Sequence, residues 1–263
     1  MSLITLSAWD LALAACLILA LAATGALLRL SLARWLVIAA LRTAVQLALV
    51  GLVLEAVFAL DRWWWVLAMG LAMLVLAGRE AYARQQRRYT GVWGYGPGTM
   101  AMFLSCSVTL VLALAVMIDV QPWYAPRYAI PLLGMLLGNT MTGVSLGLDR
   151  LTRGAWQDRA AIEARLALGQ TAQAAIAEHR RAAVRTGMIP MINAMAAAGV
   201  VSLPGMMTGQ ILAGAPPWEA VKYQILIMFL ITAATGFGTV AAVWLGARRL
   251  FDPRERLRLD RLR

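Results

Sequence analysis

Long apolar runs separated by short polar segments make up most of this chain of 263 residues. Several runs reach the roughly 20 apolar residues that an α-helix needs to cross the hydrocarbon core of a bilayer. The alternating pattern of transmembrane strands is absent from the sequence, and lipid would leave the backbone of an open sheet unsatisfied. The pattern therefore predicts an all-α, polytopic transmembrane helical bundle of about seven spans, at residues 9–28, 35–60, 64–78, 99–118, 130–148, 189–213 and 221–245.

One long polar interval, residues 149–188, interrupts this pattern between the fifth and sixth spans. Residues 157–168 are rich in helix formers, Gly169 ends that stretch, and Thr171 is suited to cap a second helix over residues 172–185. A short helix across the end of a bundle is a surface that a peripheral protein can hold. The alternative interpretation is a solvated basic loop near anionic lipid.

The net charge of +11 comes from basic residues in a few segments between the spans rather than on a soluble face. Membrane topology therefore explains the charge better than a nucleic-acid partner does. With the N-terminus outside, the inner segments and the tail contain every Lys and Arg except Arg42, Arg62, Arg127 and Lys222. The positive-inside rule thus predicts an outer N-terminus and a cytoplasmic C-terminus.

The sixth predicted span, residues 189–213, contains Pro204 and Gly205. If it turned back at this point, the basic tail would lie outside. We therefore expect a broken helix that still crosses the membrane.

The fifth span combines small residues with a restricted set of bulky ones. Gly134 and Gly138 form one small-xxx-small pair, and Gly143 and Gly147 form a second pair on the opposite face. Such pairs let helices approach closely, which predicts that this helix is packed on both sides at the bundle centre. The bulky apolar residues fall on one narrow stripe, which we interpret as the lipid-facing side: Leu137, Met141, Val144 and Leu148.

Five polar side chains inside the spans are candidates for a transport pathway. Asn139 and Thr142 lie in the fifth span and Asn193 in the sixth, whereas Arg42 and Gln46 share one face of the second. Polar groups within a membrane generally face a partner or a wet cavity. The alternatives are local packing for Asn139 and Thr142, and a snorkelling Arg42 that reaches the inner surface.

Dedicated metal or nucleotide chemistry is not visible in the sequence. Cys16 and Cys106 lie in apolar runs, as small core residues do, and the single histidine, His179, has no second histidine to pair with. Methionines at helical spacing near residue 190 favour packing over ligation of a soft metal. Lys222 is the only lysine, and no Gly-rich P-loop precedes it. The chain is therefore not expected to be an enzyme or to bind a cofactor, any metal ligands stay unassigned, and ATP with Mg²⁺ would be held by another chain.

Four stretches together resemble the FetB-type permeases of a bacterial iron-export ABC transporter, which are related to plant aluminium-resistance permeases. The polar interval also looks like the coupling loop of ABC permeases, with a longer stretch between Gly169 and Pro190. The similarity covers nearly the whole chain and rests on residues 41–47, 134–141, 163–169 and 203–211.

The resemblance implies that residues 1–263 form a single permease domain in the bacterial inner membrane, with a cytoplasmic coupling loop at about residues 149–188. It implies export of iron or a related metal species as part of metal homeostasis. It also implies a FetA-like ATP-binding subunit, two copies of each chain and contact with membrane lipid. The residues that would couple to the ATP-binding subunit are Glu163, Ala164, Arg165 and Gly169.

Two other functions are compatible with a helical bundle. A secondary transporter or a channel for a small solute would work without an ATPase, but ion coupling needs a buried acid, and the spans offer only Asp10 and Glu55, both towards the outer ends. A membrane scaffold without transport would have no need of Arg42, Gln46 and Asn139 in the bilayer.

Overall fold

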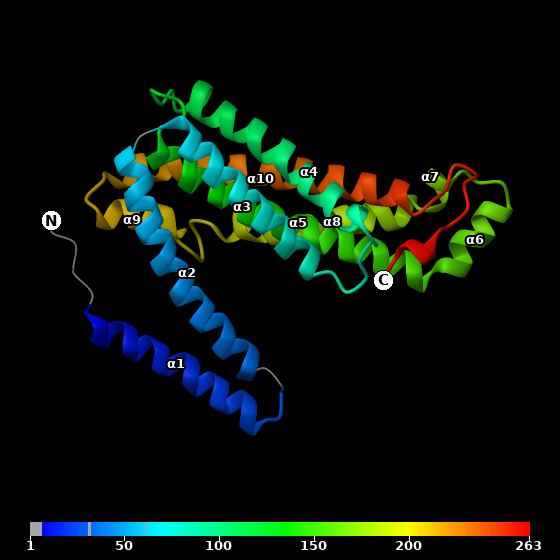
Figure 1. The fold of residues 1–263 in the computed structure, drawn as a ribbon, viewed down its shortest axis with the longest axis horizontal. Helices are drawn as coiled ribbons and strands as arrows, with labels where there is room; N and C mark the ends of the chain where they lie inside the picture. Colours follow the sequence, from blue (N-terminus) through cyan, green and yellow to red (C-terminus); the bar gives the residue numbers. More distant parts are fainter. Residues whose placement is uncertain (1–6, 31–32, 61) are drawn as a thin grey trace. The chain divides into compact units, whose positions relative to one another are not determined.

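The computed structural model describes residues 7–30, 33–60 and 62–263, and these form α-helices joined by short loops (Figure 1). The predicted all-α class is confirmed. The described chain divides into two compact units. The first holds α1 and α2, at Ala8–Leu27 and Ala33–Leu60, together with residues 212–214 at the end of α9. The second holds α3 (Trp63–Ala83), α4 (Val92–Leu112), α5 (Pro126–Gln157), α6 (Arg159–Ala167), α7 (Ala172–Ala175), α8 (Ala177–Ala197), α9 (Gly205–Leu212) and α10 (Pro217–Arg249).

In the first unit, α1 and α2 pack against each other as neighbouring helices. The buried residues of α1 are Ala22 and Gly25, whose small size permits a close approach. Ser7 caps α1: its hydroxyl accepts from the backbone of Asp10, and the Asp10 carboxylate accepts from the Ser7 N–H at 2.8 Å. The N-terminus itself, predicted to be outside, is not within the described residues.

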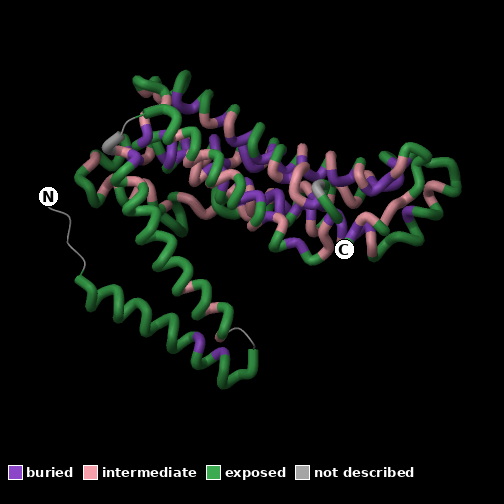
Figure 2. Tube along the Cα trace, viewed as in Figure 1, coloured by how far each residue is buried: buried purple, intermediate pink, exposed green. Residues whose placement is uncertain are grey.

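In the second unit, α5 is the central helix and contacts α3, α4, α8 and α10. Buried residues follow α5 and α10 along much of their length (Figure 2). Two glycines allow this packing. A Cβ on Gly143 would lie 2.6 Å from Thr235 Cγ2 and 3.1 Å from the Gly187 carbonyl oxygen, and one on Gly147 would lie 3.1 Å from Thr239 Cγ2.

The interpretation of one stripe of α5 was wrong. Leu137, Val144 and Leu148 are buried rather than turned to lipid. A Cβ on Gly98 of α4 would lie 3.4 Å from Val144, so the bulky side chains fill the space that this glycine leaves. The exposed positions of α5 lie elsewhere and include Tyr128, Gly138 and Leu146.

Six helices of the described chain are long and apolar enough to cross a membrane: α1, α2, α3, α4 with its continuation, α5 and α10. The predicted span at residues 189–213 is not among them, because it is divided between the end of α8 and the short α9. The break lies at residues 198–204 and is wider than the expected interruption at Pro204 and Gly205. Gly199, at φ +81°, lies within it. The orientation of the chain in the membrane stays a prediction.

Two further segments differ from the simplest expectation. The last helical turns before the loop at residue 118 form a π-helix, Ala113–Met117, that continues α4. Helix α5 runs nine residues beyond the predicted end of the fifth span, to Gln157. Its polar last turns are anchored to the loop after α3, since Asp149 accepts from the Gln86 N–H at 2.8 Å and the Thr152 hydroxyl donates to the Arg87 carbonyl at 3.0 Å.

Candidate functional site

The predicted coupling segment forms α6 followed by a tight turn. Ile162 is buried, while Glu163 and Ala164 lie on the exposed side of the helix. Gly169, also exposed, ends the segment with φ +86°, a conformation that residues with a Cβ rarely adopt. The Thr171 hydroxyl accepts from the Ala174 N–H and so caps α7, but the predicted helix over residues 172–185 is interrupted at Ile176, between α7 and α8.

Arg165, the remaining predicted coupling residue, has a different environment. Its guanidinium donates to Glu178 at 2.8 Å and therefore joins α6 to the first turn of α8. This hydrogen bond, with the charge of Arg165, holds the pKa of the Glu178 carboxyl below its usual range. Arg165 thus holds α6 in place, whereas its predicted neighbours face outward.

His179 makes a second connection to the same helix. Its Nε2 lies 2.9 Å from Asp158 Oδ2, at the start of α6, and its ring packs on Gly154 of α5. From the sequence, His179 was only a lone histidine without ligand partners. In the structure it links α5, α6 and α8.

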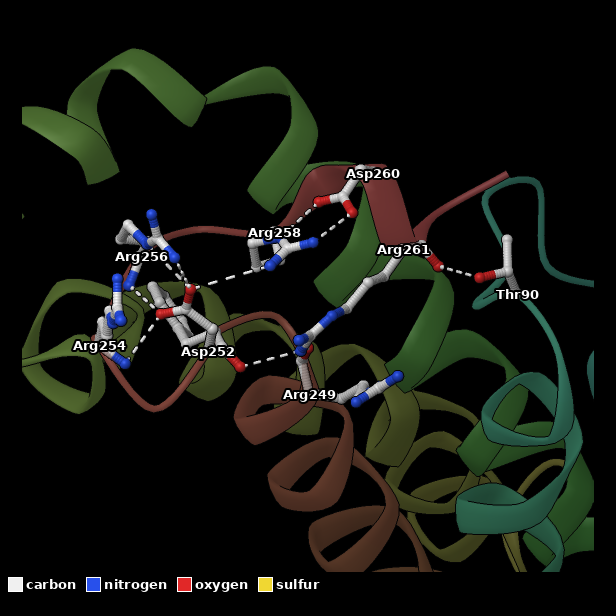
Figure 3. A network of polar contacts seen from close by, with 9 residues as sticks. Thr90, Arg249, Asp252, Arg254, Arg256, Arg258, Asp260 and Arg261 are labelled. Atoms are coloured by element: carbon white, nitrogen blue, oxygen red, sulfur yellow. Dashed lines mark hydrogen bonds and ion pairs between the residues drawn. The ribbon is translucent and has the colours of Figure 1, made fainter.

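The tail after α10, residues 250–263, is folded, and we call it the strap. It begins with a short hairpin in which Phe251 pairs with Leu257. The side chain of Asp252 holds this hairpin: it accepts from the backbone N–H groups of Arg254 and Arg256 at 2.9 and 3.0 Å (Figure 3). Its side chain is only 6% exposed, and the Arg256 guanidinium lies 2.9 Å from it. These hydrogen bonds keep the pKa of the Asp252 carboxyl below its usual range.

The far part of the strap pairs with the loop after α3. The Arg263 N–H donates to the Arg88 carbonyl at 2.7 Å, and the Arg88 N–H donates to the Arg263 carbonyl at 3.0 Å. Arg261 donates to the carbonyls of Arg249, the last residue of α10, and of Phe251 in the strap, and its own carbonyl accepts from Thr90 (Figure 3). The strap therefore joins the end of α10 to residues 88–90.

An apolar cluster lies beneath the strap and α6. It is distinct from the main helix-bundle core and unites Tyr89, Leu151, Ile162, Ile176, Leu250, Phe251 and Leu262, among others. The Tyr89 hydroxyl donates to the Gly246 carbonyl at 2.8 Å, and burial raises the pKa of that tyrosine above its ordinary value. The longer stretch between Gly169 and Pro190 supplies part of this cluster, through Ala172, Ala175 and Ile176.

A polar hollow of about 520 Å³ opens between α6 and the strap. One wall comes from Glu163, Leu166, Gly169 and Gln170, and the other from residues 254–257. The structure thus brings Glu163 and Gly169 together with charged residues of the tail. Sequence reasoning used those tail residues only for topology. The signal it missed is the recurrence of apolar positions 251, 257, 259 and 262 among the arginines.

The candidate pathway residues lie in both units. Arg42 and Gln46 are exposed on α2 of the first unit. Asn139 and Thr142 lie on α5, partly buried, and each donates to its own helix: Asn139 to the Met135 carbonyl at 2.8 Å and Thr142 to the Gly138 carbonyl at 3.1 Å. Asn193 is exposed on α8.

The packing glycines of α5 also differ among themselves. Gly143 and Gly147 face α10 and α8 closely, as described above, whereas a Cβ on Gly134 would meet only the tip of Met73, at 3.3 Å. A Cβ on Gly138 would find nothing within 4 Å.

Metal-ligating side chains do not gather in the described residues: no group of three His, Cys, Asp or Glu is found there. The methionines near residue 190 pack on α10, since Met191 is buried and the Met195 sulfur accepts from Thr232 at 3.0 Å. Sequence reasoning missed a buried hydroxyl cluster between α4, α5 and α10. In it Thr140 Oγ1 lies 3.5 Å from both Cys106 Sγ and Thr235 Oγ1.

The comparison with solved structures gives no match, but curated proteins match over most of the chain. A UPF0014 membrane protein of Synechocystis is 42% identical over 218 residues, which is 82% of this chain and 83% of that protein. The probable iron export permease protein FetB of Escherichia coli is 31% identical over 84% of this chain and 83% of its own length. Protein ALUMINUM SENSITIVE 3 of Arabidopsis thaliana is 30% identical over 78% of this chain and 72% of its own length.

Residues 8–251 match the family described as "Uncharacterised protein family (UPF0014)". The chain is a multi-pass membrane protein and belongs to the UPF0014 family.

Proposed function

We propose that this protein is the permease subunit of an ABC transporter that exports iron or a related metal species and so contributes to metal homeostasis. The observation that carries the proposal is the similarity over 223 residues to a protein named as a probable iron export permease. ATP with Mg²⁺ is bound and hydrolysed by a separate, FetA-like subunit on the cytoplasmic side. Two permeases and two ATP-binding subunits form the complex.

The exposed face of α6 supports a docking role. Glu163 and Ala164 point away from the apolar cluster that holds Ile162, so they are available to another protein. The helix is held from behind by Arg165 and His179, through their contacts with Glu178 and Asp158. Because α6 is held in this way, a displacement imposed on it by a docked protein is transmitted to α5 and α8 rather than absorbed by local bending.

The proposed pathway uses polar faces of helices rather than a cluster of metal ligands. Amide groups come from Gln46, Asn139 and Asn193, a hydroxyl group from Thr142 and a positive charge from Arg42. None of these groups is a strong ligand for ferrous iron. Because the described residues hold no ligand cluster, we propose that the cargo travels with its own ligands bound, as a chelate whose exterior forms hydrogen bonds.

The test is reconstitution with the ATP-binding subunit in proteoliposomes. We expect ATP hydrolysis to rise when the permease is present and iron chelate to move in the export direction. Glu163→Ala and Gly169→Pro should abolish most of both activities. Proline cannot adopt the positive φ of Gly169, and it removes the 2.9 Å hydrogen bond from the Gly169 N–H to Leu166.

Glu219→Ala, which removes an exposed carboxylate paired with Lys222 on α10, is the matched control. Full transport by the Glu163 and Gly169 variants would refute the proposal.

A secondary transporter is the competing function. Its coupling acid would be Asp10 or Glu55, but the Asp10 carboxylate caps α1 by accepting from Ser7. We expect transport by the Asp10→Asn, Glu55→Gln double variant to persist and to stay dependent on ATP. Transport without the ATP-binding subunit, abolished by the double variant, would favour the competing function instead.

A further inference from the structure

The strap is a preformed element rather than a loose basic tail. Asp252 closes its hairpin through two backbone hydrogen bonds and the guanidinium of Arg256. A bidentate pair joins Arg258 to Asp260, at 2.8 and 2.9 Å, and lowers the pKa of the Asp260 carboxyl to about 2. Leu262 and Phe251 are buried in the cluster beneath. Because the strap is already ordered, its binding to a partner does not require a further loss of backbone conformational entropy.

The strap is also fixed to the elements on either side of it. At one end its main chain pairs with Arg88. At the other end the Glu255 carboxylate accepts from the Ala172 N–H at 3.3 Å, at the start of α7. Leu257 packs in the same apolar cluster as Leu166 of α6. Residues 254–257 are thus held opposite α6.

The hollow between the two elements has a mixed lining. Charges of both signs surround an apolar floor formed by Leu166 and Leu257. Arg254 is exposed, and the contacts that form the hairpin use its backbone N–H rather than its guanidinium. The hairpin is therefore built without the Arg254 guanidinium, and both Arg254 and Glu163 line the hollow.

We propose that residues 254–257 of the strap are the second half of the docking surface for the ATP-binding subunit, and that the hollow receives a segment of that subunit that carries a carboxylate opposite Arg254. This inference rests on the proposed function. It enlarges the proposed contact from a single helix, α6, to a binding hollow with α6 on one side and residues 254–257 on the other. Two-sided burial excludes water from the charged pair, and this strengthens the pair relative to one on an open surface.

The lining distinguishes a protein partner from a lipid headgroup. A phosphate headgroup favours a site of uniform positive charge, whereas Glu163 and Glu255 face the same hollow as Arg254 and Arg256. An apolar floor with both signs around it matches the mixed surface of a protein segment. The observations therefore favour the ATP-binding subunit, and a headgroup becomes an outcome of the test.

The experiment compares two charge reversals in the full-length permease, held in nanodiscs and titrated with the ATP-binding subunit. Arg254→Glu changes the hollow. Arg263→Glu makes the same change of charge in the same strap, at a residue that pairs with Arg88 through its main chain and does not line the hollow. We expect Arg254→Glu to weaken binding about tenfold, which equals about 1.4 kcal/mol, whereas Arg263→Glu and the conservative Arg254→Lys bind as the unaltered protein does.

A cross-linking measurement covers the case in which Arg254→Glu disturbs the strap. A cysteine-reactive photo-cross-linker is attached to Arg254→Cys or Arg263→Cys, with Cys16 and Cys106 replaced by serine. We expect a covalent adduct with the ATP-binding subunit only from position 254. Equal binding by Arg254→Glu, or equal adducts from both positions, would overturn the inference while leaving the proposed function intact. If the unaltered permease binds no ATP-binding subunit, both proposals fail.

The nature of the ligand is tested with two lipid compositions. The titration is repeated in nanodiscs of phosphatidylcholine alone and in nanodiscs that contain phosphatidylglycerol. We expect the loss caused by Arg254→Glu to be the same in both. A loss seen only with phosphatidylglycerol would show that the hollow holds an anionic headgroup, and it would refute docking at this site.

Discussion

At the scale of single residues, small size and hydrogen bonding decide how closely the helices approach. Gly143 and Gly187 bring α5 and α8 together so closely that a Cβ on Gly187 would lie 2.6 Å from the Gly143 carbonyl oxygen. Gly138, five positions before Gly143 on the same helix, has open space around it. Two glycines that look alike in the sequence therefore have different structural roles.

Replacement of these two glycines by alanine should give opposite results. Gly143→Ala places a methyl group against Thr235 and the Gly187 backbone, which cannot move without separating the helices, so we expect a loss of about 1–3 kcal/mol in stability. Gly138→Ala should leave stability unchanged or slightly higher. Thermal unfolding of the purified protein in detergent measures both, and equal melting temperatures would contradict the packing described here.

The strap should depend on the ionised form of Asp252. Because the pKa of the folded carboxyl lies below its ordinary value of 3.8, its stabilising contribution is complete above that value and is lost as the pH falls through the lower, folded pKa. A spin label at Arg263→Cys, with Cys16 replaced by serine, should be immobile at pH 7 and should gain mobility only below about pH 4. Asp252→Asn should make the label mobile already at pH 7. A label that is equally immobile in Asp252→Asn would show that other contacts hold the strap.

At the scale of elements, the end of α10 is held by a tyrosine from a distant loop. The Tyr89 hydroxyl reaches the Gly246 carbonyl, which also accepts from the Leu250 N–H at 3.2 Å. Tyr89→Phe therefore leaves that carbonyl with one partner, and we expect a loss of about 1 kcal/mol. Tyr223→Phe, at a half-exposed site on the same helix, should cost nothing measurable. Chemical denaturation in detergent compares the two variants, and equal losses would contradict the assigned hydrogen bond.

The sequence predicted the elements better than their partners. Apolar runs located the six helices of the described residues that can span a membrane. Gly169 and Thr171 were recognised as the end of one helix and the cap of the next because these signals are local. The strap was missed because its contacts are not local: Thr90 and Arg261 are 171 residues apart. The face of α5 was misassigned because periodicity orders residues around a helix without saying which side meets its neighbours.

At the scale of the whole molecule, the second unit constrains the membrane topology. The hydrogen bond between Ala172 and Glu255 places the start of α7 and the end of α10 at the same end of that unit, and α10 is long enough to cross the membrane. If α10 crosses the membrane, the chain between Ala172 and the start of α10 has to return to the opposite side. We therefore predict that α8 and α9 cross the membrane together as a broken pair, in addition to the six candidate spans of the described residues.

This topology can be tested with cysteines at exposed loop positions in a background without Cys16 and Cys106. Cysteines at Gln170 and Arg254 should react with a membrane-impermeant maleimide only from the inner side. Cysteines at Gln121 and Gly214 should react only from the outer side. Reaction of positions 170 and 214 from the same side would show that the α8–α9 pair does not cross.

The wide separation along the chain of the two walls of the hollow has a consequence for biosynthesis. One wall, from α6 and the turn after it, is translated before α8, α9 and α10, whereas residues 254–257 are translated only after the whole of α10. Incompletely translated chains therefore expose α6 but lack the opposite wall of the hollow. If the ATP-binding subunit needs both walls, it joins only permeases whose last span has already been inserted, and the order of translation then prevents ATP hydrolysis from being coupled to an incomplete membrane domain.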